Sequence, residues 1–179
     1  DVAEDIRDHL TNPETRFQPL RIAVASGHGI GKSALVAMLI GWASDTCEDS
    51  KGVVTANTEQ QIRTKTWPEV QKWRNLSITK DWWNVTKTGM TSIVPGHAET
   101  WRVDAVTWSE HNTEAFAGLH NEGRTVFVIF DEASGVLSKI WEVAEGALTD
   151  GEGFFFAYGN PTKPDGEFAD CFDKHSHIY

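Results

Sequence analysis

A glycine-rich turn between an apolar strand and an apolar helix is the feature that most constrains the fold of this chain. The run Arg21–Ala25 is short and apolar, as expected of a buried strand, and residues 32–44 are apolar nearly all round, as expected of a buried helix. The residues that join them are Ser26, Gly27, His28, Gly29, Ile30, Gly31, Lys32 and Ser33. Glycines let the backbone curl so that several N–H groups converge on one anion, and the helix N-terminus adds a favourable partial positive charge. The pattern therefore predicts a phosphate-binding loop, or P-loop.

The last two residues of this loop, Lys32 and Ser33, predict how a nucleoside triphosphate and its metal ion would be bound. We expect Lys32 to reach the β- and γ-phosphates of ATP and the Ser33 hydroxyl to bind Mg²⁺. All residues from Ser26 to Ser33 are candidate ATP-binding residues. The first position departs from the pattern G-x-x-x-x-G-K-[S/T], because Ser26 stands where glycine is usual. The alternative interpretation is a glycine-rich turn that carries a lysine by chance.

A second apolar strand ends in two adjacent carboxylates. Phe127–Phe130 is apolar, and Asp131 and Glu132 follow it directly. A buried strand delivers its last side chains to the carboxyl edge of a parallel sheet, where ligands bind. We expect Asp131 to hold Mg²⁺, through water, and Glu132 to polarise the attacking water as general base. The alternative is a solvated strand end, and the P-loop upstream favours the catalytic interpretation because the two signals support each other.

A third apolar run ends in small polar residues. Phe154–Tyr158 predicts another buried strand, and Gly159, Asn160, Pro161 and Thr162 follow it. At the same sheet edge, Asn160 would sense the γ-phosphate and pass its loss to the rest of the molecule. The alternative is a plain strand–turn in which Asn-Pro supplies the turn chemistry. The order of P-loop, acid pair and polar strand end favours the sensor.

Apolar strands alternate with helical segments along the chain, which is typical of a parallel α/β sheet covered on both faces. Residues 81–108 instead are rich in Trp, Val, Thr and Ile and contain turn signals. They predict a small antiparallel meander with strands near 83–87, 90–94 and 101–108. The expected fold is α/β, a P-loop NTPase of the RecA-like (ASCE) class. It has a mainly parallel central sheet, helices on both faces and this meander as an insertion.

The chain is expected to divide into a lead-in segment and one domain. Apolar residues at four-residue spacing predict an amphipathic helix over residues 2–10. Residues 1–19 therefore form an N-terminal helix and lead-in segment, and residues 20–179 form the P-loop domain. Within that domain, Thr58 with Gln61 predicts a capping box that opens a helix to about Gln71, and Pro68 predicts a kink or break in that helix.

Composition narrows the function classes. With 40% hydrophobic and 23% charged residues, the sequence is that of an ordinary globular protein, and it has no apolar run of the ~18 residues that a membrane span needs. The net charge of −10 argues against a free-standing nucleic-acid binder. One stretch, Arg63–Lys80, is locally basic, and it either faces DNA phosphates or is the solvated side of a helix. Six tryptophans either stack on bases or fill a core: Trp67, Trp73, Trp82, Trp83, Trp101 and Trp108.

Taken together, the P-loop, the Asp131–Glu132 pair and Gly159–Thr162 resemble those of the N-terminal ATPase domain of a phage or prophage terminase large subunit, the motor that drives DNA into procapsids. The resemblance spans most of residues 20–170. It implies hydrolysis of Mg-ATP coupled to translocation of double-stranded DNA, with Asn160 in the coupling motif. It also implies a homo-oligomeric ring, a portal protein and a small terminase subunit as partners, no membrane partner, and the cytoplasm of the bacterial host as the location.

Two residues depart from the family pattern. Many terminases carry an arginine inside the P-loop where His28 stands, so an arginine at the γ-phosphate must come from elsewhere in the chain or from a neighbouring subunit. Gln18 is the only glutamine before the loop, at a spacing that does not suit the family's adenine contact. The candidates for the arginine are Arg63, Arg74, Arg102 and Arg124.

Several functional interpretations stay open at this stage. Full-length terminases carry a nuclease domain after the ATPase, and we expect no nuclease activity from a chain with 19 residues after Asn160. A RecA-like helicase or DNA-repair ATPase would share all three motifs. An ATP-binding assembly module with little turnover is a further alternative, which Glu132 argues against.

Overall fold

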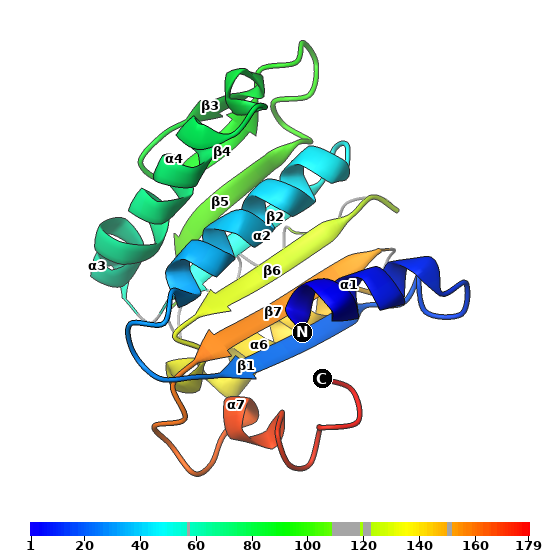
Figure 1. Cartoon of the computed structure of the whole chain (residues 1–179), viewed down its shortest axis with the longest axis vertical. Coiled ribbons are helices and arrows are strands. Elements are labelled where there is room, and N and C mark those ends of the chain that lie inside the picture. Colours follow the sequence, from blue (N-terminus) through cyan, green and yellow to red (C-terminus); the bar gives the residue numbers. More distant parts are fainter. Residues whose placement is uncertain (57, 109–118, 120–122, 150–151) are drawn as a thin grey trace.

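The computed structural model describes residues 1–56, 58–108, 119, 123–149 and 152–179. Within them, one seven-stranded sheet has the order β1-β7-β6-β2-β5-β4-β3 (Figure 1). All pairings from β1 to β5 along this order are parallel, and β4 pairs antiparallel with both β5 and β3. The strands are β1 (Leu20–Ala25), β2 (Lys51–Ala56), β3 (Trp83–Val85), β4 (Gly89–Ser92), β5 (Arg102–Thr107), β6 (Val126–Asp131) and β7 (Gly153–Gly159).

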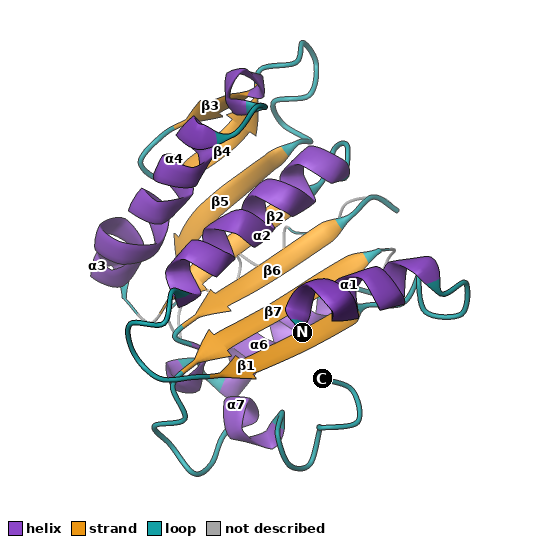
Figure 2. Cartoon of the chain, in the orientation of Figure 1, coloured by secondary structure: helices purple, strands orange, loops and turns teal. Residues whose placement is uncertain are grey.

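Helices cover both faces of the sheet, as Figure 2 shows. On one face lie α1 (Val2–Thr11), α2 (Lys32–Thr46) and α4 (Trp67–Leu76), and on the other lie α6 (Ser138–Gly146) and α7 (Glu167–Asp170). Short α3 (Glu59–Gln61) and a π-helical turn (Ile62–Thr66) lead into α4, and single 3₁₀ turns lie at Lys80–Trp82 and Ala133–Gly135. No helix in the described ranges is both long enough and apolar enough to cross a membrane.

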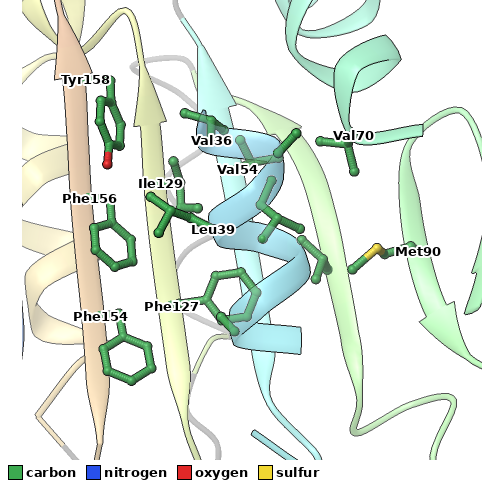
Figure 3. Packing of buried hydrophobic residues seen from close by; sticks show 14 of the residues in the cluster. Val36, Leu39, Val54, Val70, Met90, Phe127, Ile129, Phe154, Phe156 and Tyr158 are labelled. Atoms are coloured by element: carbon green, nitrogen blue, oxygen red, sulfur yellow. The ribbon is translucent and has the colours of Figure 1, made fainter. Parts of the chain in front are cut away.

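Two neighbouring interior strands, β6 and β7, are buried on both faces and separate two cores. Every residue of β6 and β7 is buried. Phe127 and Ile129 of β6 pack toward α2 with Phe156 of β7, as Figure 3 shows, whereas Val128 and Phe130 belong to the core beneath α6. Continuous apolar strands of this kind are what a parallel sheet with two covered faces requires. Because these strands are packed on both faces, the edge of the sheet where β6 and β7 end is held rigidly.

The predicted fold class is confirmed, with one refinement at the meander. Strands β3, β4 and β5 form the expected antiparallel run, but β5 also pairs in parallel with β2. The meander therefore extends the central sheet. The tryptophans support the packing interpretation: Trp67 of α4 is buried in the core with Trp83 and Trp101 of the meander region, although Trp82 is about half exposed.

The helix expected after residue 58 differs in its course. Thr58 caps it, because its hydroxyl accepts the Gln61 N–H at 3.2 Å, but the Gln61 side chain does not complete the capping box, and the helix continues to Leu76. The helix does not break at Pro68, which lies in the first turn of α4. The irregularity lies instead just before it, in the π-turn.

Candidate active site

The P-loop connects the end of β1 to the start of α2. Gly29 and Gly31 have φ angles of 74° and 93°, which cost an L-residue with a side chain about 1–2 kcal/mol. Ser26 is not among the described residues with positive φ, so its side chain is tolerated where the usual pattern has glycine. Its N–H donates to Gly159 O at 3.0 Å and ties the loop to β7. The loop thus starts from a fixed point on the sheet.

Lys32, His28 and Asn160 are brought together above this loop. The Lys32 ammonium donates to Gly27 O at 2.6 Å, to Ser26 O at 3.2 Å and to Asn160 Oδ1 at 2.7 Å. Asn160, which directly follows β7, is 5% exposed, and its amide nitrogen lies 2.9 Å from a ring nitrogen of His28. One amide therefore contacts both the cation and the imidazole of the loop.

The acid pair lies at the end of β6, beside the end of β7 (Figure 1). Asp131 is 4% exposed, and its Oδ2 accepts hydrogen bonds from Ser33 Oγ at 3.3 Å and from Thr66 Oγ1 at 2.6 Å. A carboxylate and a hydroxyl are the hard oxygen ligands that Mg²⁺ prefers, so this donor set fits a magnesium ion.

Glu132 has a different environment from its neighbour. It is half-buried, and its backbone is left-handed, with φ 63° and ψ 46°. Strained backbone of this kind persists where the surrounding structure imposes it, and it clusters at active sites. The turn directs the chain away from β6 immediately after the strand and leaves Glu132 at the surface of a pocket.

That pocket has a volume of about 260 Å³ and is lined by residues of the P-loop, the end of β6 and the π-turn. Its lining residues are His28, Gly29, Gly31, Lys32, Ser33, Ala34, Lys65, Glu69, Asp131 and Glu132. Of the remaining predicted residues, Ser26, Gly27 and Asn160 contact Lys32 behind the lining, and Ile30 is 65% exposed on the loop. The P-loop and the acid pair thus line one pocket, and Asn160 reaches it through its contacts with Lys32 and His28.

Apart from Ala34, which follows the P-loop directly, three residues of the site were not predicted from the sequence. Lys65 and Glu69 line the pocket, and Thr66 bonds to Asp131 from behind it. The sequence placed Lys65 only within a basic stretch, and nothing local distinguishes Thr66 from Thr64, its neighbour in the same turn.

The candidate arginines lie elsewhere in the described part of the chain. None of the four lines the pocket, and each pairs with a carboxylate. The pairs are Arg63 with Glu59, Arg74 with Asp45, Arg102 with Asp104 and Arg124 with Asp49. Gln18 likewise lies outside the pocket, and its side chain donates to the Glu14 carbonyl.

Comparisons with known proteins identify the relatives of this chain. No family model matches it. It is 28% identical over 153 residues to the probable terminase large subunit of Enterobacteria phage P7, covering 83% of this chain and 30% of the relative. The fold matches the large terminase of bacteriophage HK97 with a TM-score of 0.65 at 15% identity, over 97% of this chain and 35% of that one.

A second solved structure carries a nucleotide. The large terminase of a thermophilic bacteriophage in complex with ADP matches with a TM-score of 0.61 at 16% identity, over 92% of this chain and 40% of that one. The chain thus spans about a third of the length of these relatives. The resemblance drawn from the three motifs is confirmed: this chain is similar in sequence to a probable phage terminase large subunit and in fold to phage large terminases.

Proposed function

We propose that this chain is the ATPase domain of a phage DNA-packaging motor, which hydrolyses Mg-ATP to drive double-stranded DNA into procapsids. One observation carries the proposal: Lys32, Ser33, Asp131 and Glu132 line one pocket at the carboxyl edge of a parallel sheet. Together they supply the parts that phosphoryl transfer needs, namely phosphate charge, metal binding and activation of water. A chance turn or a solvated strand end would not assemble all of these around one space.

ATP binding begins with the backbone N–H groups of the P-loop, from Ser26 to Ser33. Lys32 now donates to two loop carbonyls and to Asn160, and we propose that phosphate oxygens replace these acceptors. An ammonium gains more from a charged phosphate oxygen than from a neutral carbonyl. Lys65, which lines the same pocket and forms no ion pair within the described ranges, adds a second positive charge to it.

Ser33 and Asp131 would hold the Mg²⁺ ion. When bound, the ion neutralises charge on the phosphate oxygens. The protein's part is to hold the carboxylate in place, and the hydroxyls of Ser33 and Thr66 do so by donating to Oδ2.

Glu132 acts as general base and Asn160 as the coupling residue. Glu132 takes a proton from the water that attacks the γ-phosphate, at the position where its carboxylate reaches the pocket. Asn160 contacts both Lys32 and His28, so a shift of Lys32 toward phosphate changes the partners of the amide. Since Asn160 directly follows β7, the change reaches the sheet.

Packaging requires partners beyond this domain. We propose that copies form a homo-oligomeric ring in the host cytoplasm, with double-stranded DNA, the portal protein and the small terminase subunit as partners. Because all four candidate arginines pair with carboxylates in the described structure, we assign the arginine at the γ-phosphate to a neighbouring subunit. The net charge of −10 predicts weak DNA binding by the isolated chain.

Hydrolysis by the purified chain tests this function. Phosphate release from Mg-ATP is measured with and without double-stranded DNA, for the wild type and for Glu132→Gln. We expect Glu132→Gln to bind ATP normally and to lose hydrolysis by about 10²–10⁴-fold, the usual contribution of a general base. Binding with no turnover by the wild type would favour the assembly module, and an unchanged rate in Glu132→Gln would remove Glu132 from catalysis.

A further inference from the structure

The Thr66 hydroxyl reaches Asp131 from outside the three sequence motifs. Thr66 is 1% exposed, and its Oγ1 lies 2.6 Å from Asp131 Oδ2, the shorter of the two hydroxyl contacts to that oxygen. Both hydroxyls donate to Oδ2, and no described side chain donates to Oδ1. The carboxylate is therefore held through Oδ2, and Oδ1 is left to coordinate a metal ion.

The π-turn is what presents this hydroxyl to the strand. In the same turn Thr64 Oγ1 bonds back to Gln60 O at 2.7 Å, which is the usual habit of a helical threonine. Thr66 instead donates across to β6. The widened turn closes with the bond from Trp67 N to Ile62 O, five residues back, and such single π-turns recur at functional sites.

The next residue anchors the turn from the other side. Trp67 is buried, and its indole N–H donates to Thr86 O at 2.8 Å, in the loop between β3 and β4. Thr66 is thus fixed between the end of β6 and the meander. A hydroxyl held this way can restrict the rotation of a carboxylate without touching the nucleotide.

We propose that Thr66 is a positioning residue, which orients the Asp131 carboxylate for the metal and links the metal site to the π-turn that also carries Lys65. The inference rests on the proposed function, because it assumes that a Mg-nucleotide binds in this pocket. Partners that orient a metal ligand commonly contribute about 10–100-fold to metal affinity. A merely structural Thr66 would satisfy a buried carboxylate and affect thermal stability alone.

Magnesium-dependent binding of ADP separates these two roles. Binding of a fluorescent ADP is titrated with MgCl₂, and is also measured in EDTA, for wild type, Thr66→Val, Thr66→Ser and the matched control Thr64→Val. We expect Thr66→Val to need about tenfold more Mg²⁺ for half-maximal binding. Its binding in EDTA should be unchanged, Thr66→Ser should restore the wild-type requirement, and Thr64→Val should match the wild type. Melting temperatures of all four proteins show which variants fold.

The outcomes distinguish the inference from the proposed function. If the wild type and Thr66→Val require the same Mg²⁺ concentration, the positioning role is overturned while nucleotide binding stands. If Thr66→Val does not fold, Thr66→Ser decides: a Mg²⁺ requirement shared with the wild type supports the hydroxyl, and a tenfold rise contradicts it. If the wild type binds no ADP under any condition, the proposed function and the inference both fail.

Discussion

Replacing Glu132 with glycine should stabilise the protein while abolishing hydrolysis. Glu132 has φ 63° and ψ 46°, a left-handed backbone that costs a residue with a side chain about 1–2 kcal/mol. Glycine removes that strain. Glycine also makes the unfolded chain more flexible, which lowers the free energy of unfolding by about 0.4–1 kcal/mol. Within the described structure, the Glu132 carboxylate has no hydrogen bond or ion pair to lose. We therefore expect a net gain of about 0.5–1 kcal/mol, or a rise of about 1–4 °C in melting temperature for a domain of this size.

The assay is a thermal melt followed by circular dichroism, with phosphate release measured on the same samples. Glu132→Gln is the matched control, because it removes the base but keeps the strained backbone. We expect it to lose hydrolysis like Glu132→Gly and to melt with the wild type. A glycine variant that melts at or below the wild-type temperature would refute the claim that the fold stores strain at Glu132.

Two further predictions concern charge. Lys65→Ala should weaken ATP binding about tenfold and ADP binding much less, because Lys65 adds positive charge near the terminal phosphate, and calorimetry with both nucleotides measures the difference. Burial raises the pKa of Asp49, but hydrogen bonds from Thr100 and His97 and the charges of His97 and Arg124 outweigh it and hold the pKa below 3.8. Asp49→Asn should therefore cost about 1–3 kcal/mol at pH 7. This difference should shrink as the pH falls through the lowered pKa, and denaturant unfolding between pH 7 and pH 3 measures it.

The sequence allowed the sheet edge that carries the site to be predicted, because its signals are local. An apolar strand followed by glycines and Lys32, or by Asp131 and Glu132, is visible in a few consecutive residues. Parallel strands then place such strand ends at one edge. The two pairings of β5 are harder to predict. Nothing within residues 102–107 shows that one edge of this strand pairs in parallel and the other antiparallel.

The rest of the site depends on contacts between distant residues. Pro68 predicts a kink or break because proline disrupts helix interiors, but a proline in the first turn of a helix gives the same local signal. The π-turn before it has no sequence pattern of its own. Thr66 and Thr64 are equivalent in sequence and differ only in what the fold brings near them. The partners of Arg74 and Arg124 likewise follow from tertiary structure.

Phosphate release from Mg-ATP by wild-type chain and Lys32→Ala, measured side by side with ATP binding, tests the central claim most directly. Lys32 now donates to two loop carbonyls and to Asn160, so its loss removes the cation proposed for the β- and γ-phosphates. We predict that the wild type binds and hydrolyses ATP, and that Lys32→Ala, folded to the same melting temperature within a few degrees, binds ATP at least about tenfold more weakly and releases no phosphate above background. Equal binding and equal phosphate release by the two proteins would contradict the assignment of this pocket as the site of ATP hydrolysis.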